Sequence, residues 1–149
     1  MKKRNNVNTE LLIVDDHAIV REGLKRIINE QSNLTVKHEA QTGELALEKI
    51  KSNHYDMMIL DISLPGKSGY QVLKEVKAIK PELPVLILSM HDNDYYVNKM
   101  FQAGASGYLT KDDAPEKIVE AIQLIKSGKK YTNGLSAGVL DGTLKDQNN

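Results

Sequence analysis

Polar side chains of chemically useful types follow short apolar runs at four places in this sequence. Asp15 and Asp16 come directly after one run, Asp61 after a second, Ser89 after a third, and Lys111 closely after a fourth. Transfer of a phosphoryl group to an aspartate needs a carboxylate nucleophile, further carboxylates that hold a divalent cation, an ammonium group and a hydroxyl. The sequence therefore predicts this chemistry, provided that the fold brings the five residues together.

Several carboxylates in one pocket need a cation beside them. Two carboxylates about 4 Å apart repel each other by roughly 4 kcal/mol at an effective dielectric constant of about 20. The sequence contains no cysteine, and a site in which the cation binds protein carboxylates together with phosphate oxygens suits a hard cation. We therefore expect Mg²⁺, or Mn²⁺ in its place, and Lys111 would add a permanent positive charge.

The apolar runs themselves predict strands. Each run is too short for a helix and lacks polar alternation, which is typical of strands that are buried on both faces. The runs comprise residues 11–14, 57–60, 85–88 and 107–109. Residues 35–39 predict a fifth, more polar strand, which we place at an edge of the sheet.

Segments with an apolar stripe of helical period separate these strands. The stripes contain Val20, Leu24, Ile27 and Ile28; Leu47 and Ile50; Val72, Leu73, Val76 and Ile79; Val97, Met100 and Phe101; and Ile118, Ile122 and Ile125. Asp113, Pro115 and Glu116 resemble a capping box before the last helix. The alternation predicts an open, doubly wound α/β fold with helices on both faces of a parallel sheet. In such a sheet ligands bind beyond the carboxyl ends of the strands, where the polar residues stand.

The composition argues against several functional classes. The 149 residues suit one domain with its own core. Twenty basic and twenty acidic residues give a formal net charge of zero, so we expect no general attraction to nucleic acids or membranes. The absence of a long apolar run favours a cytoplasmic location. We predict a flexible segment at 1–9, a domain at 10–128, and a linker or terminal helix at 129–149.

Four motifs together resemble a known family. The acidic pair at 15–16, the run 61–69, Ser89 and the run 108–111 are similar to the receiver domain of two-component response regulators. The resemblance covers residues 10–128. It implies a flavodoxin-like (βα)5 fold with a five-stranded parallel sheet in the order 2-1-3-4-5. It also implies a sensor histidine kinase or a phosphotransfer protein as the partner that donates the phosphoryl group.

Three further runs, residues 14–23, 88–92 and 104–111, are similar to the NarL/FixJ (LuxR-type) subfamily. Members of that subfamily carry a C-terminal helix-turn-helix, which implies control of transcription. No such motif follows Gly128 here. The expectation is therefore either a piece of a longer protein, which would contact DNA only through the missing domain, or a stand-alone phosphorelay receiver.

The resemblance also implies roles for individual residues. Asp61 would be the phosphoacceptor and, with Asp16, a direct ligand of the metal. Asp15 would reach the metal through water, and Ser63 through its backbone carbonyl. Lys111 would pair with an oxygen of the phosphoryl group.

Ser89 and Tyr108 are the expected switch residues. Ser89 would hydrogen-bond the phosphoryl group and Tyr108 would swing inward as Ser89 moves, which would change the surface and promote a homodimer. The dimer face stays open between helix four, strand five and helix five on one side and helices one and five on the other. We hypothesise that Met90, with Ser63 and His91, slows loss of the phosphoryl group by shielding it from water.

The chain is expected to be a switch, not an enzyme, although it would phosphorylate itself from small donors and dephosphorylate itself. The main rival is a phosphatase of the haloacid dehalogenase type, which carries a second aspartate where Ser63 stands. Phosphate-binding motifs of nucleotide-binding proteins are missing. The four histidines show no metal-ligand spacing, so we expect no metal or catalytic base role for them, although His17 and His91 could line the crevice.

Overall fold

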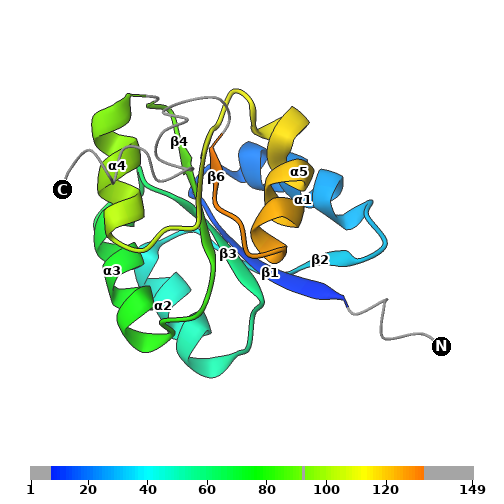
Figure 1. Ribbon diagram of the computed structural model, residues 1–149. Coiled ribbons are helices and arrows are strands. Elements are labelled where there is room, and N and C mark those ends of the chain that lie inside the picture. Colours follow the sequence, from blue (N-terminus) through cyan, green and yellow to red (C-terminus); the bar gives the residue numbers. More distant parts are fainter. Residues whose placement is uncertain (1–7, 92, 133–149) are drawn as a thin grey trace.

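The computed structural model describes residues 8–91 and 93–132 (Figure 1). The strands in these residues are β1 (Thr9–Val14), β2 (Leu34–Ala40), β3 (Met57–Asp61), β4 (Val85–Ser89), β5 (Gly107–Thr110) and β6 (Tyr131–Thr132). The helices are α1 (Ala18–Asn29), α2 (Gly43–Ser52), α3 (Gly69–Ile79), α4 (Asp94–Gln102) and α5 (Ala114–Lys126). This alternation confirms the predicted doubly wound α/β fold.

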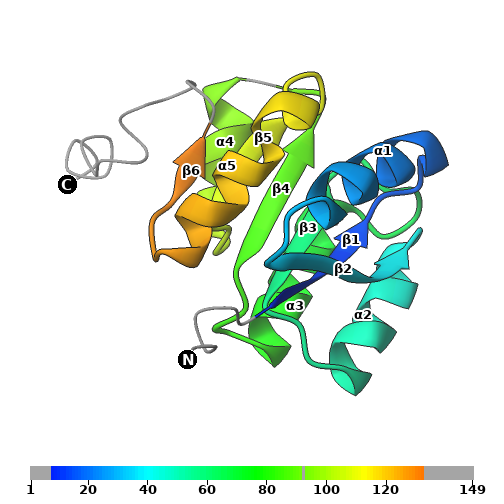
Figure 2. The same cartoon turned by 90° about the vertical axis from the view of Figure 1, so that its right-hand side faces the viewer.

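All neighbouring strands of the sheet run parallel, in the order β2-β1-β3-β4-β5-β6. The first five strands have the order expected for the flavodoxin-like arrangement. Helices α1 and α5 pack on the face that Figure 2 turns toward the viewer, and α2, α3 and α4 cover the other. The strand order reverses at β1 and β3, which is where an open α/β sheet binds its ligand.

The sixth strand departs from the prediction of five. Tyr131–Thr132 pairs with β5, within a segment whose composition predicts a linker. Two residues are too few to show a strand period, so the sequence pattern gives no sign of it. At the other end β1 already begins at Thr9, which the sequence places in the flexible segment. The predictions for residues 1–7 and 133–149 lie outside the described residues.

Two apolar layers enclose the sheet, because successive strand residues point to opposite faces. Leu12 and Met58 belong to the layer under α2, α3 and α4, whereas Leu11 and Met57 belong to the layer under α1 and α5. Every residue of β3 and β4 is buried, and full burial of an aliphatic side chain stabilises the fold by about 1.5–3 kcal/mol. Burial on both faces explains why these strands are apolar up to their last residues, Asp61 and Ser89. β2 is only partly buried between its two ends, as expected at an edge.

Side-chain oxygens cap the first turns of α2, α3 and α4. Thr42, Ser68 and Asn93 each accept a hydrogen bond from the backbone amide three residues later. The capping box predicted before α5 is wrong, since the Asp113 side chain makes no capping hydrogen bond. Its backbone is already helical rather than extended, and the extended conformation is what lets a capping side chain reach back to the first turn.

Gly69 is the first residue of α3 and lies in close contact with the backbone that follows β3. A Cβ atom at this position would lie 2.2 Å from Ile62 Cα and 2.7 Å from the backbone oxygen of Asp61. Only glycine allows this approach, and the Gly69 amide donates a hydrogen bond to the Ile62 carbonyl at 3.2 Å. The turn after β3 is thereby held close to the carboxyl end of that strand.

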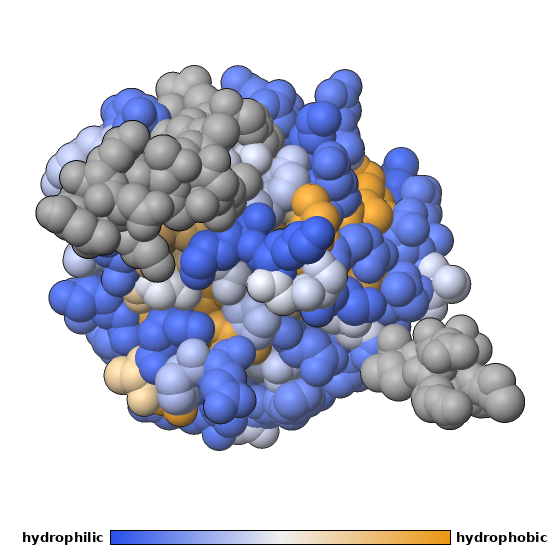
Figure 3. Space-filling view, viewed as in Figure 1, coloured by the Kyte–Doolittle hydropathy of each residue, from blue (hydrophilic) through white to orange (hydrophobic). Residues whose placement is uncertain are grey.

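The molecular surface is mostly polar. Hydrophilic residues cover most of the face seen in Figure 3. The exposed large apolar and aromatic side chains among the described residues are Ile19, Leu45, Ile79, Met90 and Tyr95. In the described ranges no helix has both the length and the apolar character that crossing a membrane requires.

Candidate functional site

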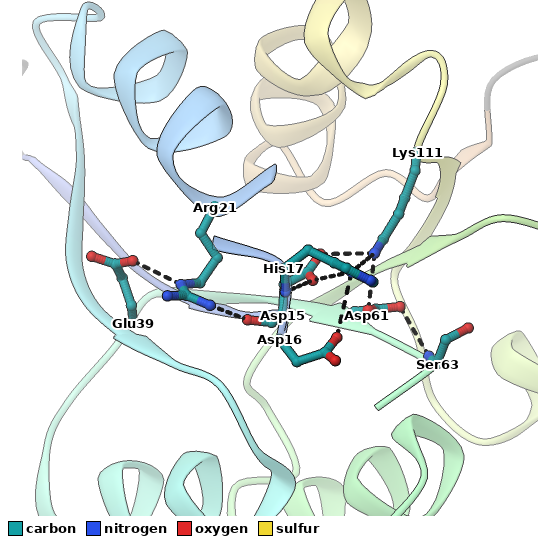
Figure 4. A network of polar contacts seen from close by, with 8 residues as sticks. All are labelled: Asp15, Asp16, His17, Arg21, Glu39, Asp61, Ser63 and Lys111. Carbon is teal, nitrogen blue, oxygen red and sulfur yellow. Dashed lines mark hydrogen bonds and ion pairs between the residues drawn. The ribbon is translucent and has the colours of Figure 1, made fainter. Parts of the chain in front are cut away.

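The carboxyl ends of four strands meet at one edge of the sheet. Asp61 ends β3 and Ser89 ends β4, while Asp15 follows β1 and Lys111 follows β5. Figure 4 shows the side chains of Asp15, Asp16, Asp61 and Lys111 pointing toward one another. The structure thus gathers the carboxylates and the ammonium group that the sequence analysis singled out.

Lys111 is the cationic centre of this cluster. Its side chain is only 6% exposed, and Nζ lies 3.0 Å from Asp15 Oδ2 and 3.0 Å from Asp61 Oδ2. Both carboxylates are fully buried. Burial lowers the pKa of Lys111, but hydrogen bonds to Asp61 and Asp15 more than offset this effect, so the pKa is raised. Lys111 is therefore a permanent cation between two buried anions.

Asp61 is held at both of its oxygens. Oδ1 accepts a hydrogen bond from the Ser63 amide at 2.9 Å, and Oδ2 faces Lys111. Burial raises the pKa of Asp61, the Ser63 amide and Lys111 lower it, and the charge of Asp15 raises it further. The net effect is a pKa above the ordinary value, because burial penalises the charged carboxylate more than its hydrogen bonds stabilise it.

The cluster has the donor atoms that a divalent cation requires. One ligand atom from each of Asp15, Asp16, His17 and Asp61 lies within 4.8 Å of the others. Asp15 Oδ2 and Asp16 Oδ1 are shielded from solvent, and their partners among the described residues are Lys111 and His17 respectively. Carboxylate oxygens in an anionic pocket fit a hard cation such as Mg²⁺.

His17 lies beside the carboxylates, in the crevice that the sequence analysis allowed it to line. Its Nδ1 lies 3.1 Å from Asp15 Oδ1, 3.4 Å from Asp16 Oδ1 and 3.1 Å from Lys111 Nζ. Its backbone amide donates to Asp15 Oδ1 at 2.8 Å. A search for paired histidines misses such a residue, whereas its place directly after two aspartates is the available signal.

Ser89 and Tyr108 meet at the backbone of His91. The His91 amide donates a hydrogen bond to Ser89 Oγ at 2.8 Å, and the Tyr108 hydroxyl donates to the His91 carbonyl at 2.7 Å. Both side chains are fully buried. The Tyr108 ring thus already occupies an inward position in this structure, and the two expected switch residues hold one residue of the β4–α4 segment from both sides.

The three residues assigned to tuning lie nearer the surface. Met90 is 63% exposed, and Ser63 and His91 are also exposed. The His91 ring stacks on Tyr96 of α4, with ring centroids 4.9 Å apart. Their shielding role stays a prediction.

Two charged residues that the sequence analysis did not single out border the cluster. Arg21 of α1 donates a hydrogen bond to the backbone carbonyl of Asp15, and Glu39 of β2 pairs with Arg21 (Figure 4). An arginine on a helix and a glutamate in an edge strand look like solvated charges in a sequence. Only the pairing of β1 with β2 brings them together.

Comparisons with known proteins identify similar chains. A model of the response regulator receiver domain family matches residues 11–123. Response regulator UvrY of Escherichia coli is 35% identical over 121 residues, and transcriptional regulatory protein DegU of Brevibacillus brevis is 32% identical over 127 residues. These matches cover 81% and 85% of this chain but 56% and 54% of the relatives. The chain therefore spans about half the length of the curated relatives it matches.

Solved structures agree with this result. A LuxR-family two-component response regulator from an Aurantimonas species superposes with a TM-score of 0.81 at 30% identity, over 95% of this chain and 99% of that one. The signal receiver domain of a NarL regulator from Mycobacterium tuberculosis superposes with a TM-score of 0.77 at 34% identity, over 83% and 99% of the chains. The likeness thus extends over the whole domain.

Proposed function

Because this chain belongs to the response regulator receiver domain family, with relatives of the NarL/FixJ type, we propose that it is a cytoplasmic phosphoacceptor switch. Asp61 takes a phosphoryl group from a sensor histidine kinase or a phosphotransfer protein. The observation that carries the proposal is the buried Asp61 carboxylate, which faces Lys111 at 3.0 Å inside a cluster of metal donors.

The transfer exchanges one bond for another. An Asp61 oxygen attacks the phosphorus, an oxygen–phosphorus bond forms, and the phosphorus–nitrogen bond to the donor histidine breaks with its electron pair left on the imidazole. Asp15, Asp16, Asp61 and the Ser63 carbonyl would hold Mg²⁺ or Mn²⁺, which offsets the charge of the incoming group. Lys111 exchanges part of its contact with Asp61 for a phosphoryl oxygen.

The conformational switch depends on a change in the hydrogen-bond partner of Ser89. Its hydroxyl now accepts from the His91 amide, and it turns to donate to the new phosphoryl oxygen. The His91 backbone then loses its hydrogen bond to Ser89 and keeps the one from Tyr108. A phosphoryl group that binds better to the second arrangement shifts the equilibrium between the two. The β4–α4 surface changes, and the altered surface promotes a homodimer.

The output in the full protein is control of transcription. DegU is named a transcriptional regulatory protein, and this chain matches about half of it. DNA would be contacted through a helix-turn-helix domain outside the 149 residues, since the chain itself carries no net charge. The runner-up is a stand-alone phosphorelay receiver, which would pass the phosphoryl group on to another protein.

Incubation with acetyl phosphate and Mg²⁺ tests the proposal without a kinase. We expect intact mass spectrometry to show one added phosphoryl group, and size-exclusion chromatography to show a larger species. Chelation of the metal with EDTA serves as the control and prevents the adduct. A chain that stays unmodified at saturating donor and Mg²⁺ would overturn the assignment.

We expect Met90→Ala to shorten the life of the phosphorylated state by a few-fold. The exposed Met90 side chain follows Ser89, and its removal opens a path for water toward the phosphoryl group. Decay of the adduct is followed by intact mass after removal of the donor. Ile79→Ala is the matched control, because it shortens another exposed apolar side chain at the far end of α3. Equal decay of wild type and Met90→Ala would refute the shielding role.

A further inference from the structure

Arg21 connects the acidic pair to the neighbouring strand. It lies on the first turns of α1 and its side chain is 14% exposed. Nη1 donates a hydrogen bond to the backbone carbonyl of Asp15 at 2.6 Å, and Nε donates to Glu39 Oε1 at 3.0 Å. One planar guanidinium thus binds a main-chain oxygen and a carboxylate at once, as its fixed fork allows.

Glu39 holds Arg21 in this orientation. It lies near the end of β2, where it pairs with Ile13 of β1. A hydrogen bond from Lys25 lowers the pKa of Glu39, burial raises it, and a hydrogen bond from Arg21 lowers it again, so the net pKa is below the ordinary value. Glu39 is therefore an anion at neutral pH. Lys25 Nζ lies 2.6 Å from its second oxygen, Oε2.

Arg21 binds the backbone oxygen of Asp15, which lies between the two aspartates. The Asp15 carbonyl belongs to the peptide unit that joins Asp15 to Asp16, so its direction fixes how the two carboxylates leave the backbone. On the other side of the residue, the Asp15 amide donates to the Ala40 carbonyl at 3.0 Å. Both backbone groups of Asp15 are thereby tied to α1 and β2.

The charge of Arg21 does not explain this arrangement. A cation beside the pocket would by itself repel Mg²⁺, but Arg21 and its neighbour Lys25 are matched by two carboxylates, Glu39 and Glu22. What remains is a geometric effect. Partners that orient metal ligands typically change metal affinity by about 10–100-fold when they are removed.

We propose that Arg21, held by Glu39, is a positioning residue that fixes the peptide between Asp15 and Asp16 and so sets how tightly the pocket binds a divalent cation. The inference rests on the proposed function, because it assumes that these carboxylates bind the metal. It assigns α1 and β2 a part in metal affinity, although neither Arg21 nor Glu39 is a ligand.

The test compares Arg21→Met with Lys25→Met. Both variants remove a cation of α1 that contacts Glu39, but only Arg21 contacts Asp15. Binding of Mn²⁺ alone is measured from the loss of the free-ion electron paramagnetic resonance signal, and Mg²⁺ is measured by competition. We expect Arg21→Met to bind Mn²⁺ about tenfold more weakly, and Lys25→Met to bind it as wild type does.

A second measurement separates positioning from general damage. The rate of modification by acetyl phosphate is recorded against Mg²⁺ concentration. We expect Arg21→Met to need more Mg²⁺ for half its maximal rate but to approach the wild-type maximum. Thermal unfolding by circular dichroism checks the fold. Should Arg21→Met not fold, Arg21→Lys and Glu39→Gln loosen the same contacts more gently and are expected to weaken Mn²⁺ binding to a smaller degree.

The outcomes distinguish this inference from the proposed function. Wild-type Mn²⁺ affinity in folded Arg21→Met, or an equal loss in Lys25→Met, would overturn the positioning role while the switch stands. A wild-type chain that neither binds Mn²⁺ nor accepts a phosphoryl group would refute the proposed function and the inference with it.

Discussion

Asp61→Asn is expected to abolish modification by acetyl phosphate completely, whatever the Mg²⁺ concentration. An amide keeps the shape of the side chain and can still accept the Ser63 hydrogen bond, but it is not a nucleophile for phosphorus. Intact mass spectrometry after incubation with donor and Mg²⁺ gives the readout. The loss should be total, because the proposal assigns all of the modification to the Asp61 carboxylate and the amide cannot replace it as the nucleophile.

Asp56→Asn is the matched control for this experiment. The same substitution is made directly before β3, at the opposite end of the strand that Asp61 ends, where Asp56 Oδ2 accepts the Glu10 amide at 2.8 Å. Asp56→Asn should be modified like wild type. A phosphoryl adduct on Asp61→Asn equal to that of wild type would place the phosphoacceptor elsewhere.

Asp61→Asn should also change how the free energy of unfolding depends on pH. Burial raises the pKa of Asp61 in the folded chain, so the folded state holds this proton more tightly than the unfolded state. The stabilisation from Asp61 is complete below the ordinary aspartate pKa and is lost as pH rises through the raised pKa. Asp61→Asn has no proton to lose. In metal-free buffer we therefore expect urea unfolding to show that Asp61→Asn gains stability over wild type as pH rises from acidic to neutral.

Lys111→Met is expected to lower the free energy of unfolding by roughly 3–5 kcal/mol in metal-free buffer. The substitution leaves the fully buried carboxylates of Asp15 and Asp61 without the cation that lies 3.0 Å from each. Added Mg²⁺ should restore part of the loss, because a ligand that binds only the folded state stabilises it. Urea unfolding with and without Mg²⁺ measures both effects.

An exposed lysine provides the comparison. Lys126 lies in the last turn of α5, and Lys126→Met should change stability by no more than about 0.3–1 kcal/mol with no dependence on Mg²⁺. Similar unfolding free energies for the two variants would contradict the view that Lys111 neutralises the buried carboxylates. We also expect Lys111→Met to be modified more slowly, since it lacks the cation that pairs with the phosphoryl group.

The fold and the centre of the site could both be predicted from the sequence, because the apolar runs mark the strands. Strands buried on both faces are apolar along almost their whole length, so the polar residue that ends or follows each apolar run lies at a known edge of the sheet. This logic places Asp15, Asp61 and Lys111 at one edge before any coordinates are known. It works because parallel strands leave all their carboxyl ends on the same side.

The remaining features depend on tertiary contacts that no local pattern encodes. Arg21 meets Glu39 only because β2 lies beside β1. His17 reaches the carboxylates because its backbone amide turns onto Asp15. Whether Asp113 caps its helix depends on one backbone angle, and β6 forms only because β5 offers it a free edge. Sequence types and spacing do not contain this information.

The two outer strands of the sheet have a consequence for aggregation. An exposed, long and apolar edge strand is a template for unwanted strand addition. Here β6 covers β5 with only two residues, and the opposite edge, β2, carries Lys37 and Glu39 and is partly exposed along most of its length. Neither edge of the described sheet offers a long apolar template. Backbone pairing of this described sheet with the sheet of a second copy is therefore disfavoured, so a regulated contact between copies is expected to use side chains rather than strand addition.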